Sequence, residues 1–225
     1  MAAVLAAEEK LFARIAEDLL ANSWSVIPAA LPSVLSAALQ QQIQSKGATD
    51  FCPAGIGRGT DHAIAEQVRR DEILWIEGAT EAEREWLDWS GRLQTYLNRR
   101  LFLGLFSFES HFAHYAPGAF YRKHLDAFKV QASHDAAEED GTNRVVSLVA
   151  YLNAEWQPED GGELVLYAVD GNIEVGRVTP AQGTLVVFLS EDIPHEVLPA
   201  QRDRFSIAGW YRINQTRHGR TDPPR

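Results

Sequence analysis

The sequence is short of cysteine and of uninterrupted apolar stretches. Cys52 is the only cysteine among 225 residues, so no disulfide can form within the chain, and we expect an inert thiol there. No apolar run free of charged residues is long enough to cross a bilayer, so we expect no membrane partner. The stretch MAAVLAAEEKLFARIAEDLL mixes acidic residues into its apolar positions, unlike a secretion signal. Together these features predict a cytoplasmic protein.

Basic residues are scarce relative to acidic ones. The chain has 21 Lys and Arg against 31 Asp and Glu, which gives a formal net charge of −10. Proteins that bind a nucleic-acid backbone neutralise its phosphates with Lys and Arg. We therefore expect no nucleic-acid partner.

The N-terminal part has helical patterning. Apolar residues recur every three or four positions in 4–22 and in EAEREWLDWSGRLQTYLNRR, and a further helix is expected over 32–45. Residues 47–70 gather Gly, Pro and polar side chains, which predicts a long loop or finger. The segment DEILWIEG that follows could form a strand.

From about residue 105 the sequence changes to short runs of β-branched and aromatic residues separated by turn residues. The expected strands are 106–115, 120–126, 144–153, 163–168, 173–178, 184–189, 194–199 and 204–213. The predicted fold class is mainly β with supporting helices, a double-stranded β-helix (jelly roll) preceded by an α-helical part. The expected division is 1–100 for helices and finger packed on the core, 101–213 for the jelly roll, and 214–225 for a tail.

His124 and Asp126 stand two residues apart in a segment predicted to be extended. Alternate side chains of a strand project from the same face, so one strand could offer both to a metal ion. A histidine from a distant strand would complete two imidazoles and one carboxylate, the set that leaves iron(II) open positions for oxygen chemistry. His195, in DIPHEVLP, is the candidate. Taken alone, the His-x-Asp tripeptide favours a surface ion pair over a metal site, with His195 as a turn histidine beside Pro194.

Arg204 follows nine residues beyond His195 and opens the predicted strand RFSIAGWYR. A guanidinium can bind a carboxylate through two parallel hydrogen bonds. We expect Arg204 to anchor a carboxylate on a strand adjacent to that of His195.

Longer motifs surround these residues. HYAPGAFYRKHLDAF leads into the first ligand pair, RVVSLVAYLNAEWQPEDGGELVLY contains YLN, W and GG elements, and PHEVLPAQRDRFSIAGWY contains the distal histidine and arginine. In order and spacing they resemble the oxygen-sensing prolyl hydroxylases of the Fe(II)/2-oxoglutarate oxygenase superfamily, in a compact form typical of bacterial prolyl 4-hydroxylases. The resemblance covers roughly residues 70 to 213.

The resemblance implies a metal and cosubstrate site. It makes His124, Asp126 and His195 ligands of Fe(II), with no catalytic residue beyond that centre. It makes Arg204 the partner of the distal carboxylate of 2-oxoglutarate, with Tyr151 hydrogen-bonded to the same group. A buried core tyrosine is the alternative interpretation of Tyr151.

Further residues match positions that line the pocket in the relatives. Tyr115 is expected beside the cosubstrate, and Tyr121 near the metal on the substrate side. Arg144 and Trp210 are expected to face the substrate, although an exposed strand arginine and a buried sheet tryptophan are also common structural residues. Ala208 departs from the human oxygen-sensing enzymes, which have threonine there, so their oxygen affinity cannot be transferred to this chain.

The implied activity is a 2-oxoglutarate-dependent dioxygenase that uses O2, with ascorbate as reductant, to hydroxylate the 4-position of a prolyl residue in a protein. Translation elongation factor Tu is the candidate substrate, and the segment 47–70 would close over it. The alternatives are hydroxylation or demethylation of a free amino acid or other small molecule, and a non-catalytic binding module. The other histidines are interpreted as structural or surface residues: His62, His111, His114, His134 and His218.

Overall fold

Helices cover one side of the molecule in the computed structural model, which describes residues 2–47, 50–54, 67–127 and 143–214. They are α1 (Ala2–Asn22), α2 (Ser33–Gln44) and α3 (Glu81–Leu101). All three confirm helices predicted from the sequence. None of the helices in the described part of the chain combines the length and the apolar character that a membrane crossing requires.

The capping of α3 is encoded locally. Thr80 accepts a hydrogen bond from the backbone N–H of Glu83 at 3.2 Å, which satisfies one of the free donors at the start of the helix. The buried Glu83 carboxylate accepts further backbone N–H groups from the preceding turn, such as that of Gly78 at 2.9 Å. At the other end Arg99 and Arg100 complement the helix dipole.

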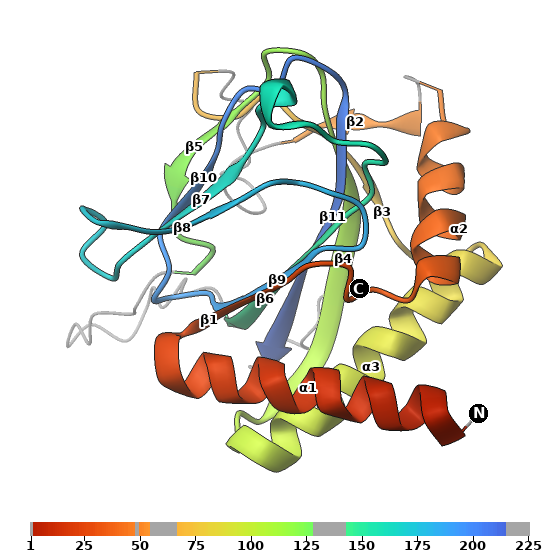
Figure 1. The fold of residues 1–225 in the computed structure, drawn as a ribbon, viewed down its shortest axis with the longest axis vertical. Coiled ribbons are helices and arrows are strands. Elements are labelled where there is room, and N and C mark those ends of the chain that lie inside the picture. Colours follow the sequence, from red (N-terminus) through yellow and green to blue (C-terminus); the bar gives the residue numbers. More distant parts are fainter. Residues whose placement is uncertain (1, 48–49, 55–66, 128–142, 215–225) are drawn as a thin grey trace, which may run out of the picture.

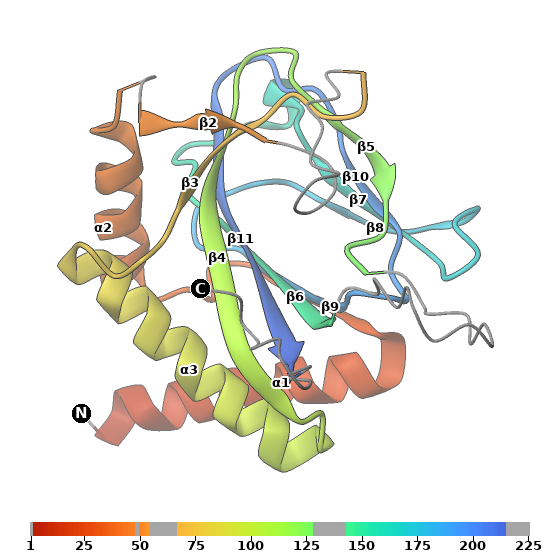
Figure 2. The ribbon, with the colours of Figure 1, turned by 180° about the vertical axis from the view of Figure 1, so that it is seen from behind.

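The larger of two β-sheets has seven strands in the order β1-β9-β6-β11-β4-β3-β2. In chain order these are β1 (Trp24–Ile27), β2 (Cys52–Pro53), β3 (Glu72–Trp75), β4 (Leu105–Tyr115), β6 (Arg144–Tyr151), β9 (Leu185–Leu189) and β11 (Arg204–Ile213). All paired neighbours run antiparallel. Figures 1 and 2 show the helices against one face of this sheet.

The smaller sheet, in the order β5-β10-β7-β8, lies opposite the other face of the larger one (Figure 1). Its strands are β5 (Tyr121–His124), β7 (Leu164–Tyr167), β8 (Glu174–Val178) and β10 (His195–Val197). A short 3-10 helix, η3 (Pro158–Asp160), precedes β7. Two antiparallel sheets packed face to face, with helices behind one of them, confirm the predicted jelly roll.

Two apolar layers follow from the alternation of side chains along the strands. On β11, Ile207 and Tyr211 are fully buried in the cluster that the helices share with the large sheet. The alternate residues, such as Ser206 and Trp210, point toward the small sheet instead. A second cluster, which includes Tyr115 and Tyr151, lies between the two sheets. The interior between the sheets therefore receives both apolar and polar side chains.

The predicted strands after residue 105 are all present. β11 has the predicted bounds, β4 begins one residue earlier than predicted, and the other six are shorter. β1 was missed because it is only four residues long, and β2 lies inside the segment 47–70 predicted as a loop. Since β1 and β3 pair within the large sheet, the N-terminal part contributes strands as well as helices. The division near residue 100 stays a prediction. Most of the predicted finger and of the tail lies outside the described residues.

Candidate functional site

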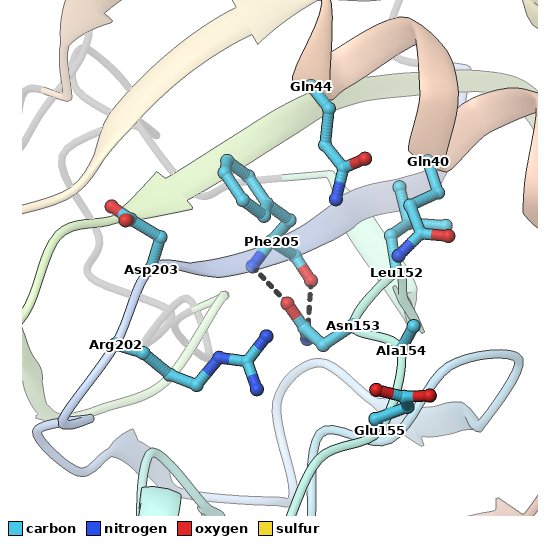
Figure 3. Close-up of a pocket in the computed structure, with 9 residues that line it drawn as sticks. All are labelled: Gln40, Gln44, Leu152, Asn153, Ala154, Glu155, Arg202, Asp203 and Phe205. Atoms are coloured by element: carbon cyan, nitrogen blue, oxygen red, sulfur yellow. Dashed lines mark hydrogen bonds between the residues drawn. The ribbon is translucent and has the colours of Figure 1, made fainter.

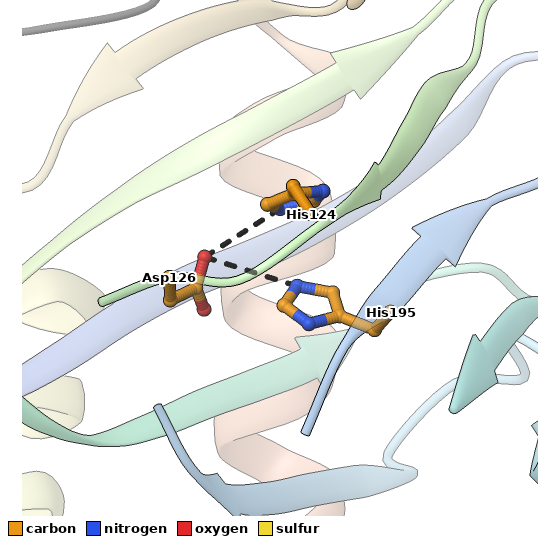
Figure 4. Close-up of side chains that lie close together, drawn as sticks. All are labelled: His124, Asp126 and His195. Carbon is orange, nitrogen blue, oxygen red and sulfur yellow. Dashed lines mark ion pairs between the residues drawn. The ribbon is translucent and has the colours of Figure 1, made fainter. Parts of the chain in front are cut away.

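Three predicted ligands meet between the two sheets, and Figure 4 shows their side chains converging. The Asp126 Oδ1 atom lies 3.6 Å from Nε2 of His124 and 3.8 Å from Nε2 of His195. One ligand atom from each residue falls within 4.8 Å of the others. Ligand atoms at neighbouring positions of an octahedral ion lie about 3 Å apart when each bond is about 2.1 Å. Two imidazoles and one carboxylate thus fit iron(II) with a small contraction.

Backbone hydrogen bonds orient both imidazoles. Nδ1 of His124 lies 2.8 Å from the carbonyl oxygen of Arg122, and Nδ1 of His195 lies 3.0 Å from that of Ile193. A carbonyl oxygen only accepts, so each Nδ1 carries the proton and donates. Each Nε2 is left with its lone pair directed at the space beside Asp126, as metal binding requires.

Hydroxyl groups hold the carboxylate. Ser147 on β6 donates a hydrogen bond to Asp126 Oδ2 at 2.7 Å, and its Oγ lies 2.9 Å from Oγ of Ser190. The prediction that His124 and Asp126 share one strand is corrected here, because β5 ends at His124. Asp126 follows in a bend, and Ser147 fixes the carboxylate from the opposite sheet. The serine that interrupts the apolar run RVVSLVAY was the available sequence signal.

The site favours a neutral His195 imidazole beside an ionised Asp126 carboxylate. Burial alone would raise the pKa of Asp126, but His195 and His124 outweigh burial and hold it well below its usual range. Burial lowers the pKa of His195 to about 4. These are the protonation states in which His195 and Asp126 can act as metal ligands.

Arg204 is 1% exposed, and no carboxylate in the described part of the chain pairs with it. Its Nε donates to the carbonyl oxygen of Gly162 at 2.8 Å, and an Nη donates weakly to Ser206 Oγ at 3.4 Å. A buried charge without a counter-charge is strongly destabilising, so this arginine favours an anionic ligand. The expectation that Arg204 and His195 occupy adjacent strands is wrong, because β11 and β10 belong to opposite sheets.

Residues of the YLN, W and GG elements lie around Arg204 and form hydrogen bonds with the neighbouring backbone. Asn153 exchanges hydrogen bonds with the backbone of Phe205, and Trp156 Nε1 donates to the Gly161 carbonyl oxygen at 2.9 Å. Gly162 has a φ of +70°, and a Cβ there would lie 3.1 Å from Arg204 Cδ. A side chain at Gly162 would therefore displace the guanidinium.

Two tyrosines flank Arg204. The guanidinium carbon lies 4.9 Å from the ring centre of Tyr115 and 5.0 Å from that of Tyr151. Burial raises the pKa of Tyr151 to about 12, so its hydroxyl is a neutral donor. That hydroxyl is buried without a hydrogen-bond partner among the described residues. Arg204 and Tyr151 thus present unused donors to the same interior space.

The residues predicted to face a substrate lie on the same interior. Tyr121 stacks on His124, with ring centres 3.5 Å apart and planes inclined by 14°. Arg144 lies over Trp210, with 3.6 Å from the guanidinium carbon to the ring centre. Trp210 is paired in register with Ser147, the residue that holds Asp126. The arginine and tryptophan therefore lie next to the metal ligands.

Sequence reasoning missed the support of Tyr121. Arg69 lies over the Tyr121 ring at 4.4 Å and forms two hydrogen bonds to the buried Asp71, one of 2.7 Å. Arg69 also makes an isolated β-bridge to Tyr121. The last residues of the predicted finger segment 47–70 are thus attached to the strand that carries His124.

Two of the histidines interpreted as structural lie in the described chain. His111 is buried, and burial lowers its pKa to about 4. His114 lies 2.7 Å from a carboxylate oxygen of Asp203.

A separate cavity of about 320 Å³ lies between Gln40 on α2 and Phe205 (Figure 3). None of the predicted site residues lines it.

Comparison with known proteins supports the geometric interpretation. Residues 110–212 match the family model of the 2OG-Fe(II) oxygenase superfamily. The chain is similar to the crystal structure of a Pseudomonas putida prolyl-4-hydroxylase, with 43% identity, a TM-score of 0.77, and coverage of 90% of this chain and 99% of that one. It is also similar to a Trichoplax adhaerens prolyl hydroxylase in complex with a hypoxia inducible factor peptide fragment, with 26% identity, a TM-score of 0.76, and coverage of 94% and 93%.

A more distant similarity is to Egl nine homolog 1 of Mus musculus, which is 25% identical over 175 residues. This match covers 69% of the present chain and 40% of the mouse protein, so the chain spans less than half of that relative. The bacterial similarity, in contrast, extends over nearly the whole solved chain. The chain therefore belongs to the 2OG-Fe(II) oxygenase superfamily.

Proposed function

We propose that the protein is an Fe(II)- and 2-oxoglutarate-dependent dioxygenase that hydroxylates the 4-position of a prolyl residue in a protein. One observation carries the proposal. A triad of two imidazoles and one carboxylate occurs together with a buried arginine that has no acidic partner in the described chain. The triad suits iron(II), and the arginine suits the carboxylate of a 2-oxo acid.

His124, Asp126 and His195 would hold the metal through Nε2, Oδ1 and Nε2. Bound iron(II), with 2-oxoglutarate and O2 as cosubstrates, supplies the oxidising power to hydroxylate an unactivated carbon. Ascorbate would serve as reductant. The protein contributes ligands that hydrogen bonds already orient, so metal binding requires little rearrangement.

Arg204 and Tyr151 would bind the distal carboxylate of 2-oxoglutarate. Both side chains are fully buried, and the Tyr151 hydroxyl has no hydrogen-bond partner among the described residues. The guanidinium neutralises the ligand charge, while the tyrosine hydroxyl adds a neutral hydrogen bond. Tyr115, whose ring centre lies 4.9 Å from the guanidinium carbon, would restrict the movement of Arg204.

The substrate side is built from rings. Trp75, His111 and Trp210 form a row across β3, β4 and β11, with 5.3 Å and 5.4 Å between successive ring centres. With Tyr121 above His124, this row offers apolar surfaces to a saturated ring such as that of proline. The similarity to solved prolyl hydroxylases supports the same substrate class.

Translation elongation factor Tu is the proposed protein substrate, by resemblance to bacterial prolyl 4-hydroxylases. The test incubates the protein with iron(II), 2-oxoglutarate, ascorbate and elongation factor Tu, and maps added oxygen by mass spectrometry. We expect one oxygen on a proline, dependent on 2-oxoglutarate and absent in His195→Ala.

Two further experiments test the substrate class and the activity separately. In the first, free L-proline replaces the protein substrate. Turnover of free L-proline, with elongation factor Tu left unmodified, would favour a small-molecule hydroxylase. The other measures succinate without any substrate. If no succinate forms under any condition, the dioxygenase proposal itself fails.

A further inference from the structure

Glu109 on β4 bridges two arginines from neighbouring strands. Its Oε1 accepts a hydrogen bond from an Nη of Arg144 on β6 at 3.1 Å, and its Oε2 accepts one from Arg212 on β11 at 3.2 Å. Arg212 is fixed further by donation from its Nε to Asn143 Oδ1 at 2.6 Å. The Arg144, Glu109 and Arg212 side chains are 18%, 27% and 6% exposed, so water screens these contacts only in part.

The register of the sheet explains why these residues meet. Trp210 is paired with Glu109 on one side and with Ser147 on the other, and Arg212 is paired with Arg144. Residues paired in register point to the same face, so Glu109 lies in the same row as Trp210, and the two arginines that it bridges lie in the next row. Glu109 thus restrains the guanidinium that covers the Trp210 ring.

Trp210 provides an independent sign of a ligand. It is 8% exposed, and its indole Nε1–H is buried with no hydrogen-bond partner among the described residues. A buried donor without a hydrogen-bond partner costs folding free energy. A ligand atom that accepts a hydrogen bond, such as a peptide carbonyl oxygen, would satisfy this N–H. The stacked guanidinium restricts how the indole and an incoming chain can be arranged.

We propose that Glu109 is a positioning residue that holds Arg144 flat on Trp210 and so presets the surface on which the protein substrate binds. The proposal rests on the proposed function, in which Arg144 and Trp210 face the substrate. Glu109 acts through Arg144 and does not touch the reacting atoms. Its loss should therefore weaken substrate binding while iron and 2-oxoglutarate binding are retained.

The first test needs no substrate. In iron-free protein labelled with nitrogen-15, the indole N–H signal of Trp210 is assigned by its loss in Trp210→Phe. Arg144→Ala should shift this signal, and Glu109→Ala should move it close to the Arg144→Ala position, with Glu109→Gln intermediate. Glu174→Gln, which breaks an exposed ion pair with Arg177, is the control and should leave the signal unchanged. A Trp210 signal that stays at its wild-type position in both Glu109 variants would overturn the proposal.

The second test measures hydroxylation of elongation factor Tu. Glu109→Ala should raise the KM for this protein about fivefold and leave the KM for 2-oxoglutarate and substrate-free succinate formation unchanged. Arg144→Ala should raise it about tenfold, and the double variant should match Arg144→Ala, because the effect of Glu109 passes through that residue. Additive effects of the two substitutions would contradict the proposal.

The two tests separate this inference from the function on which it rests. If wild-type protein forms succinate but leaves elongation factor Tu unmodified, elongation factor Tu is excluded as the substrate. The position of the Trp210 signal then tests the role of Glu109. If Arg144→Ala leaves the KM for the protein unchanged, Arg144 does not bind substrate, and the positioning role fails with it.

Discussion

The floor and the mouth of the interior between the two sheets are built differently. The floor is defined as His124, Asp126, His195, Arg204 and Tyr151. The first four of these side chains are fixed by hydrogen bonds to the backbone or to a nearby hydroxyl, and Tyr151 is fully buried beside Arg204. The mouth, defined as Arg144, Trp210, Glu109, Tyr121 and Arg69, is held by ion pairs and ring stacking between side chains from different strands.

This difference indicates in which part of the site the residues should vary. Floor contacts come from elements with their own sequence motifs, such as the glycine pair beside Arg204, whose geometry leaves little freedom. Mouth contacts depend on partners that can change together, because an ion pair can be replaced by other groups of similar size. We therefore expect the floor to determine the chemistry and the mouth to determine the substrate.

The largest expected effect is at the floor. Asp126→Ala removes the only carboxylate of the triad and leaves Ser147 without its acceptor. We expect turnover to fall at least about a thousandfold, together with loss of iron binding. Succinate formation and iron content measure this, with Asp170→Ala in an exposed turn as the control. Full activity in Asp126→Ala would exclude the metal site.

Arg204→Ala tests the second part of the floor. The substitution removes the cation that we assign to the distal carboxylate of 2-oxoglutarate. The KM for 2-oxoglutarate should rise about a hundredfold, since a bidentate ionic contact is lost, while iron binding persists. Arg204→Lys keeps the positive charge but cannot form two parallel hydrogen bonds to a carboxylate, so it should recover only part of the affinity for 2-oxoglutarate. An unchanged KM for 2-oxoglutarate in Arg204→Ala would refute the assignment.

His111 allows a test of stability near the mouth. Burial lowers its pKa to about 4, so between about pH 6.5 and pH 4 the unfolded chain binds a proton that the folded protein does not. Stability is therefore lost as the pH falls through this window. His111→Phe should reduce the difference in unfolding free energy between pH 7 and pH 4.5 by roughly 2 kcal/mol. Urea unfolding at both values measures it, and an equal difference in both proteins would show that His111 does not contribute.

The smallest effect is expected at the mouth. Arg144→Ala should raise the KM for the protein substrate about tenfold and leave substrate-free succinate formation unchanged. Steady-state kinetics with varied substrate and varied 2-oxoglutarate separate the two. A fall in substrate-free turnover equal to that of Asp126→Ala would mean that floor and mouth are not independent.

Much of the floor was predictable because its residues lie in continuous motifs. The spacing of His124 and Asp126, the position of Arg204 and the alternation along 204–213 can be recognised without knowledge of pairing. The opposite-sheet placement of His195 and Arg204 was missed, because strand order does not follow from strand positions. Sequence spacing indicates neither which strands cross between sheets nor where a strand bends.

The mouth was less predictable, since its contacts depend on register. Glu109 has no motif, and only the pairing of β4 with β11 places it opposite Trp210. Arg69 and Asp71 lie more than 50 residues before His124 and reach it through Tyr121. Such contacts arise from the packing of distant strands, which local patterns do not encode.

The central claim is that the triad holds iron and that Arg204 holds 2-oxoglutarate beside it. Calorimetric titration without oxygen, first with iron(II) and then with 2-oxoglutarate, tests it in wild type, His195→Ala and Arg204→Ala. We expect one iron and one 2-oxoglutarate to bind in wild type, neither to bind in His195→Ala, and iron alone to bind in Arg204→Ala. Binding of 2-oxoglutarate to Arg204→Ala with wild-type affinity, or of iron to His195→Ala, would contradict it.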